Sequence, residues 1–134
     1  MNELVQRFFD GGPFAVVGAS SDRDKFGNRV LRAYMEAGLT AYPVNPRSPE
    51  IEGLEAYPSL ADLPQTVSGV SIITPPAVTE RVVEDAAAEG AEIVWMQPGA
   101  ESDIAIARAK ELGLEVIAGG PCVLVDLPHW RLGR

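Results

Sequence analysis

Short, almost wholly apolar runs alternate with segments of helical periodicity along most of the chain. Five runs are predicted to be strands: residues 14–18, 40–45, 70–74, 92–96 and 114–118. Between them, the residues from Phe26 onward and residues 79–89 and 102–112 show helical spacing. Apolar strands joined by crossover helices of about ten residues require a parallel sheet with both faces covered. The sequence therefore predicts an α/β fold: a doubly wound, mostly parallel, Rossmann-like sheet of about five strands.

The expected strand order is 3-2-1-4-5, with helices on both faces and residues 51–57 as a very short third strand. Pro43 is awkward inside the second strand because proline donates no ladder hydrogen bond, so an edge position is favoured. Asn2 is expected to cap an N-terminal helix, and Asp24 the helix that follows the first strand. Residues 1–134 are expected to form a single domain, with the N-terminal helix within 1–12 and an irregular tail at 119–134.

Charge and composition exclude several classes of function. The 134 residues carry a net charge of −8, which disfavours non-specific binding to nucleic acid. No stretch reaches the roughly 18 apolar residues that a membrane span needs. Cys122 is the only cysteine, so an internal disulfide is excluded and a cytoplasmic location is expected. The sequence contains no HExxH or Cys-x-x-Cys motif, so neither a metal site nor a catalytic constellation is expected.

Ligands of open α/β sheets bind beyond the carboxyl ends of the strands, where the strand order reverses. Four loops meet at that edge here: residues 18–25, 45–48, 74–78 and 97–100. The candidate ligand-binding residues are therefore sought in these loops.

The first loop, GASSDRDKFG, joins the first strand to the next helix. Gly18 allows a sharp turn and a close approach of a ligand, and Gly27 lets the helix lie near the strand or the ligand. Free N–H groups and the positive end of the helix dipole stabilise a phosphate or pyrophosphate there, with Lys25 or Arg23 adding charge. The loop is not a G-x-G-x-x-G fingerprint, and a plain glycine turn into a helix is the other interpretation.

The second loop, Asn45-Pro46-Arg47, lacks the Asp or Glu that binds ribose hydroxyls in NAD-type folds. Arg47 carries a fork-shaped cation suited to a phosphate monoester. This disfavours NAD and leaves two ligands open, NADP with its 2′-phosphate and coenzyme A with its 3′-phosphate. A solvated arginine after an Asn-Pro turn is the alternative.

The third loop, Thr74-Pro75-Pro76, is rigid, because its two prolines fix the backbone. The loop could form an apolar wall against adenine, with the Thr74 hydroxyl facing the phosphates. The alternative is that the prolines simply end the strand before the next helix. In the fourth loop, Gln97 places an amide at the same rim. The hydrophobic residues at 95–96 and 127–132 are candidates for a dimer surface.

Five blocks of the sequence together resemble a known family. In order, they are GASSDRDKFGNRV, YPVNPR, EGLEAYPSLADLP, IITPPAVTERVVEDAAAEGAEIVWMQPGA and AKELGLEVI. They are similar to the small stand-alone bacterial and archaeal CoA-binding proteins. That family is in turn similar to the CoA-binding domain of the succinyl-CoA synthetase α subunit and of NDP-forming acyl-CoA synthetases. The resemblance runs from about Phe14 to about Cys122.

The resemblance implies a non-catalytic Rossmann-like domain that binds coenzyme A or an acyl-CoA. The family's pyrophosphate turn is matched by Gly18, Ala19, Ser20 and Ser21, and the start of its first helix by Lys25, Phe26 and Gly27. The segment near its 3′-phosphate is matched by Asn45, Pro46 and Arg47. The wall at the nucleotide is matched by Thr74, Pro75 and Pro76, and a position at the rim by Gln97. The alternatives are an NADP-dependent oxidoreductase and a ligand-free regulatory subunit on the same fold. A homo-oligomer or a partner enzyme subunit is also considered.

Overall fold

A computed structural model describes residues 2–133, so Met1 and Arg134, the outermost residues of the expected N-terminal helix and tail, lie outside the description. Its five-stranded sheet is parallel throughout and has the order β2-β1-β5-β6-β7. The strands are β1 (Phe14–Val17), β2 (Ala41–Val44), β5 (Gly69–Ile72), β6 (Ile93–Met96) and β7 (Glu115–Ile117). The predicted doubly wound α/β fold is confirmed, and the strand order reverses beside β1.

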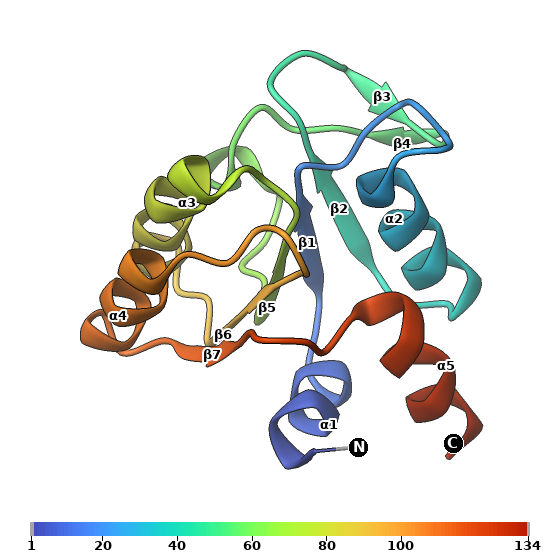
Figure 1. Ribbon diagram of the computed structural model, residues 1–134. Coiled ribbons are helices and arrows are strands. Elements are labelled where there is room, and N and C mark those ends of the chain that lie inside the picture. The colour runs from blue at the N-terminus through green and yellow to red at the C-terminus, as the bar shows by residue number, and fades with distance from the viewer. Residues whose placement is uncertain (1, 134) are drawn as a thin grey trace.

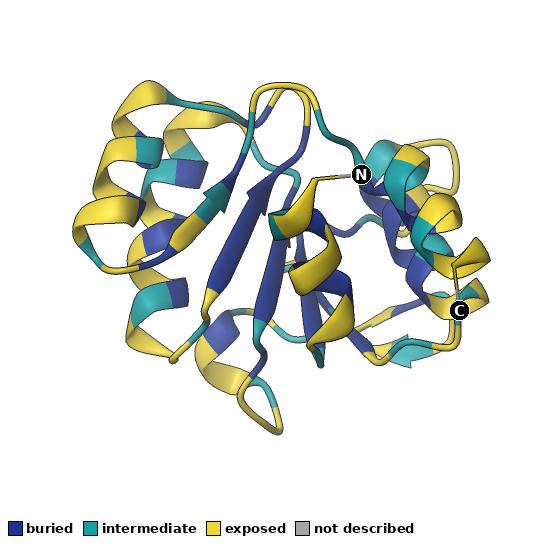
Figure 2. Ribbon diagram, turned by 90° about the horizontal axis from the view of Figure 1, so that it is seen from below, coloured by how far each residue is buried: buried dark blue, intermediate teal, exposed yellow. Residues whose placement is uncertain are grey.

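Helices cover both faces of this sheet (Figure 1). The helices are α1 (Glu3–Asp10), α2 (Phe26–Glu36), α3 (Pro76–Ala88), α4 (Asp103–Glu111) and α5 (Val123–Leu132). Helices α3 and α4 lie on one face, and α2 and α5 lie on the other, with α1 at the end of the sheet where β1 begins. Figure 2 shows the buried strands between these layers, while the outward sides of the helices are exposed.

The expected third strand is wrong as a member of the main sheet. Residues 50–55 instead form a separate antiparallel hairpin of β3 (Glu50–Ile51) and β4 (Leu54–Glu55), followed by the 3₁₀ turn η1 (Leu60–Asp62). Beyond this hairpin, Tyr57 forms an isolated parallel bridge to Val44 of β2. Pro43 lies in β2 at the edge of the sheet, and it offers its carbonyl to the Tyr57 N–H but has no N–H of its own. A longer ladder on this side of β2 would therefore lack a donor.

The start of α1 agrees with the expected Asn2 cap, whereas the starts of α2 and α3 differ from the sequence prediction. The side chains of Asn2 and Ser102 cap α1 and α4 by accepting from the N–H groups three residues later. Asp24 does not cap α2; its own N–H donates to Asp22 in a local turn, and Lys25 occupies the cap position. Helix α3 begins at Pro76 rather than at residue 79, because proline is well suited to the first helical turn.

The expected irregular tail is also wrong, since residues 123–132 form α5 despite Pro128 inside it. Val123 and Leu127 are buried, and the Trp130 indole N–H donates to Asp10 of α1 at 2.9 Å. The sequence of α5 is apolar nearly all round, so it shows no helical periodicity. Packing against α1 and α2 stabilises this helix where local propensity does not.

The two faces of the sheet bury different side chains. The α2/α5 face holds an aromatic cluster of Phe8, Phe9, Phe14, Tyr34 and Trp95. The α3/α4 face is filled by smaller aliphatic side chains such as valine and alanine. Trp95 and Met96 are fully buried, so they cannot contribute to a dimer surface. Within residues 2–133, none of the helices is both long and apolar enough to cross a bilayer.

Candidate functional site

A cleft of about 660 Å³ opens at the carboxyl edge of the sheet. This volume falls within the roughly 300–1,000 Å³ typical of small-molecule sites. The cleft lies where the strand order reverses, and it is bounded by the turn after β1, the end of β2, the end of β5 and one side of α3. Most of the predicted site residues line it: Gly18, Ala19, Ser20, Lys25, Phe26, Gly27, Asn45, Pro46, Arg47 and Thr74.

The turn between β1 and α2 is built by direct contact of backbone with backbone. Gly18 has φ 94°, and a Cβ atom there would lie 1.9 Å from the carbonyl oxygen of Ile73. A Cβ atom on Gly27 would lie 2.1 Å from the carbonyl oxygen of Gly18. Only glycine fits at either position, so the predicted close approach of α2 to the first strand is confirmed.

Several backbone N–H groups in this turn and at the start of α2 have no protein acceptor. Among the described residues, the N–H groups of Ala19, Ser20, Phe26 and Gly27 donate to no protein oxygen. Phe26 and Gly27 open α2, whose dipole places partial positive charge at the same end. The exposed Lys25 occupies the cap position beside them. Such an arrangement attracts an anion of the size of a phosphate or diphosphate.

The buried side chain of Asn28 fixes the path of the turn from behind. Its amide nitrogen donates to the carbonyl oxygen of Ser20 at 2.8 Å and to Glu52 of the β3–β4 hairpin at 3.1 Å. Its amide oxygen accepts from Arg32 at 2.7 Å. Glu52 also lies 3.4 Å from Arg23, which points that arginine away from the cleft. No local sequence pattern predicts this network, because its members come from separate segments.

Asn45 performs a similar structural role at the end of β2. Its amide nitrogen donates to the carbonyl oxygen of Ala19 at 2.8 Å, and its oxygen accepts from the N–H of Arg47 at 2.7 Å. The side chain thus ties the second loop to the first. Arg47 itself is exposed at the cleft and forms no ion pair with the described residues. The absence of a carboxylate directly after β2 holds in the structure as in the sequence.

Thr74 and residues of α3 form the side of the cleft opposite Asn45 and Arg47. The Thr74 hydroxyl lies 2.8 Å from the Thr79 hydroxyl, so it is already hydrogen-bonded within the protein. Pro75 caps α3 and Pro76 starts it, and neither lines the cleft. The expected proline wall is therefore replaced by Val78 and Val82, which lie one and two turns further along the helix.

Two further predicted residues lie outside the cleft. Ser21 is exposed on the outer side of the turn. Gln97 is only 1% exposed; its side-chain oxygen accepts from the N–H of Val123 at 3.0 Å, and its amide nitrogen has no partner among the described residues. Gln97 lies on the same side of the sheet as Trp95, because side chains alternate along a strand. It joins β6 to the start of α5 instead of reaching the rim.

Sequence reasoning missed one wall of the cleft. Residues 58–60 lead into η1 and line the cleft from the hairpin side, and Val78, Val82 and Asp85 line it from α3. The spacing 78, 82, 85 places these three on one helix face, a signal that was available in the sequence. The position of residues 58–60 depends on a loop whose course the sequence does not indicate.

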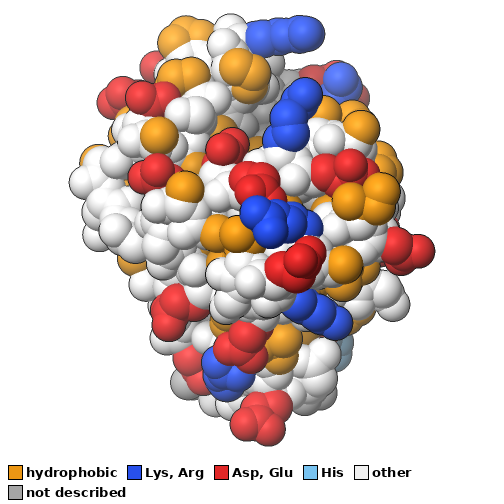
Figure 3. Space-filling view, turned by 90° about the vertical axis from the view of Figure 1, so that its left-hand side faces the viewer, with side chains coloured by type: hydrophobic (Ala, Val, Ile, Leu, Met, Phe, Trp, Pro, Cys, Tyr) orange, Lys and Arg blue, Asp and Glu red, His pale blue; other side chains and the backbone are white. Residues whose placement is uncertain are grey.

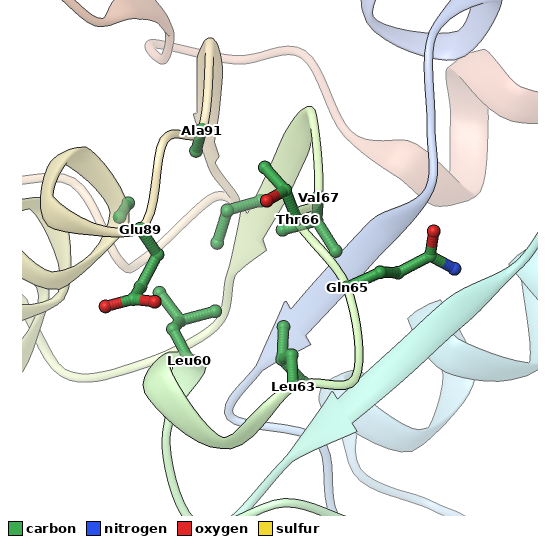
Figure 4. A pocket seen from close by; sticks show the side chains of 9 residues that line it. Leu60, Leu63, Gln65, Thr66, Val67, Glu89 and Ala91 are labelled. Atoms are coloured by element: carbon green, nitrogen blue, oxygen red, sulfur yellow. The ribbon is translucent and has the colours of Figure 1, made fainter.

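A second hollow of about 200 Å³ lies near the other end of α3 (Figure 4). Apolar side chains such as Leu60, Leu63 and Val67 surround it, and Glu89 is the charged side chain at its rim. It has no cation and no helix N-terminus among its lining residues, so it does not suit a phosphate. Over residues 2–133, no three His, Cys, Asp or Glu side chains are placed to share a metal ion.

Comparisons with known proteins agree with this geometry. The chain is 32% identical over 93 residues to the ADP-forming acetate–CoA ligase I of Archaeoglobus fulgidus, which covers 67% of this chain but 14% of the ligase. It is 30% identical over 117 residues to the uncharacterized protein YneT of Bacillus subtilis, covering 87% of this chain and 84% of YneT. The chain thus spans a small part of the ligase and nearly all of YneT.

A solved structure shows the same fold over almost the full length. The hypothetical protein from Pyrococcus horikoshii OT3 superimposes with a TM-score of 0.90 and 30% identity, covering 97% of this chain and 92% of that one. Residues 13–128 match the family model described as the CoA binding domain. Since that match includes every strand of the main sheet and every loop of the cleft, the chain belongs to the CoA binding domain family.

Proposed function

We propose that this protein binds coenzyme A or an acyl-CoA in the cleft at the carboxyl edge of the sheet. The diphosphate is held by the backbone N–H groups of Ala19 and Ser20 and by the N-terminus of α2. Arg47, with Lys25, neutralises the 3′-phosphate. The observation that carries this proposal is the convergence of unpartnered N–H groups from the turn and from α2 on one space.

The net charge of −8 does not oppose such binding. Charges on the far surface are screened by salt beyond a Debye length of about 8–10 Å. On the side of the cleft next to the β1–α2 turn, Lys25, Arg47 and the end of the α2 dipole supply a positive field, while Asp85 lies on the α3 side. Phosphates at this place therefore experience a positive field despite the acidic exterior.

The proposed function is binding rather than group transfer. The family description names binding alone, and the matched ligase contains far more chain than this domain. We propose that chemistry on the thioester takes place on a partner enzyme subunit.

An NADP-dependent oxidoreductase is the second candidate, and Arg47 is the observation that favours it. A guanidinium beyond the second strand suits a 2′-phosphate as well as a 3′-phosphate. Isothermal titration calorimetry with coenzyme A, dephospho-CoA, NADP and NAD separates the candidates. We expect coenzyme A to bind tightest and dephospho-CoA clearly more weakly. Tight NADP binding without coenzyme A binding would contradict the proposal.

The Arg47→Ala variant tests the role of the guanidinium. We expect it to weaken coenzyme A binding about tenfold or more, because a charge-assisted contact to phosphate contributes roughly 1.5–3 kcal/mol. Dephospho-CoA binding should not change. Arg29→Ala, which removes an exposed arginine of α2 outside the cleft, is the control and should bind both ligands normally. Excess absorbance near the nucleotide maximum in purified protein would argue against a ligand-free regulatory subunit.

A further inference from the structure

One acidic side chain lines a cleft whose other charged side chains are basic. Asp85 of α3 shares a helix face with Val78 and Val82, and all three line the cleft. Lys25 lines it from the cap position of α2, and Arg47 lines it from the loop after β2. The cleft therefore has cations on one side and a carboxylate on the α3 side.

The Asp85 carboxylate forms no hydrogen bond and no ion pair with the described residues, Lys25 and Arg47 included. Its neighbour Glu84 differs, because that carboxylate is paired with Arg108 of α4 on the outer face. Figure 3 shows that face, where acidic and basic side chains are interspersed. Asp85 is thus turned to the cleft, with its acceptor capacity unused by the protein.

A carboxylate in this position restricts which part of a ligand can lie against α3. Phosphates are repelled by it and attracted by Arg47 and Lys25, so they are directed to the opposite side. Between Asp85 and those cations the wall is apolar, formed by Val78, Val82, Leu60 and Pro58. The ligand group that fits there is a flat apolar ring whose edge carries a neutral hydrogen-bond donor.

We propose that Asp85 determines base specificity by accepting a hydrogen bond from the exocyclic amine of adenine. This inference rests on the proposed function, since the adenine belongs to coenzyme A. The ring lies between Leu60 and the valines of α3, and the amine points to the carboxylate. A base with a carbonyl at the same ring position presents an acceptor to the carboxylate there, so it loses this hydrogen bond and binds more weakly in the same pose.

The test compares coenzyme A with its purine analogue, in which hydrogen replaces the adenine amine. Wild-type protein should bind the analogue about tenfold more weakly, because a bond to a charged acceptor is lost. Asp85→Ala should bind the two ligands equally. Glu84→Ala, which removes the adjacent carboxylate of the same helix, should keep the wild-type preference. Asp85→Asn retains one carbonyl acceptor and should keep part of it.

The outcomes separate the two proposals. Equal binding of coenzyme A and its purine analogue by wild-type protein would overturn the role of Asp85 while leaving the proposed function intact. The same conclusion follows if Asp85→Ala keeps the wild-type ratio. No binding of coenzyme A by wild-type protein would overturn both. Because Asp85 is exposed, its variants are expected to fold, and their unfolding midpoints serve as the check.

Discussion

At the cleft the backbone of the β1–α2 turn touches its neighbours directly, whereas at the opposite end of the sheet aromatic rings fill the space between α1, α2 and β6. Gly18 and Gly27 leave no room for a side chain. The centroid of the Phe8 ring lies 5.2 Å from that of Phe14 and 5.2 Å from that of Trp95, in contacts that a smaller side chain can partly replace. Backbone contacts set the shape of the cleft, while the rings supply much of the buried area.

The largest effect is expected at Gly18. Gly18→Ala should destabilise the fold by more than about 4 kcal/mol, because its Cβ atom would overlap the carbonyl of Ile73 and both are backbone groups. Gly113→Ala is the matched control, since Gly113 also has positive φ, 87°, but has open space around it. It should cost about 1–2 kcal/mol from strain alone. Urea unfolding measures both, and equal losses would contradict the close-contact argument.

A substitution in the aromatic cluster should lower the stability of the fold without weakening coenzyme A binding. Phe8 is 1% exposed and contacts Phe9, Phe14 and Trp95. Phe8→Ala should cost about 3–5 kcal/mol from lost burial and the cavity left behind. Phe8→Leu keeps most of the volume and should cost less. Titration at a temperature where each variant is folded should give the wild-type affinity for coenzyme A; a weaker affinity would show that the two regions are coupled.

A smaller effect is expected from the hydrogen bond within the aromatic cluster. The hydroxyls of Tyr34 and Ser71 are fully buried and lie 2.6 Å apart. Tyr34→Phe leaves the Ser71 hydroxyl unpaired and should cost about 1–3 kcal/mol. The double variant Tyr34→Phe/Ser71→Ala removes both groups, so it should be more stable than Tyr34→Phe alone. Chemical denaturation of Tyr34→Phe, Ser71→Ala and the double variant checks this, and strict additivity would refute it.

The smallest effect is expected from surface ion pairs in acid. A hydrogen bond from Arg7, together with its charge, lowers the pKa of Glu115, and Arg108 lowers that of Glu84 in the same way. A carboxyl with a lowered pKa in the folded state contributes stability above its ordinary pKa, and this is lost as the pH falls through the lowered value.

Thermal unfolding of Glu115→Gln should therefore show a slightly weaker loss of stability in acid than wild type. The difference should shrink in high salt, because both partners are half exposed. Glu36→Gln, which removes a carboxylate without an ion pair among the described residues, is the control and should follow wild type. An unchanged acid profile for Glu115→Gln would show that the pair contributes nothing.

The fold and the cleft differ in how far the sequence indicates them. Apolar strands such as 14–17 and 93–96 predict a parallel sheet because only burial on both faces explains them. The sequence also predicts that Gly18 and Arg47 line the cleft, because the loops that follow parallel strands meet at the carboxyl edge of the sheet.

The features that the sequence does not predict depend on contacts between distant segments of the chain. The α5 helix forms because Val123 and Leu127 pack on the rest of the protein, and no local pattern reports that packing. Gln97 follows a strand as expected, but the direction of its side chain is decided by the start of α5. Asp85 lines the cleft only because the helix that starts at Pro76 packs beside it, and the sequence does not indicate that packing.

The amide nitrogen of Asn28 has two protons, and it gives one contact to Ser20 and another to Glu52. The β1–α2 turn and the β3–β4 hairpin are therefore joined through one buried group. A designer who lengthens or exchanges the hairpin must carry Glu52 along or supply a new acceptor. Otherwise an unsatisfied amide is left beneath the very loop that has to keep its shape, at a cost of about 1–3 kcal/mol.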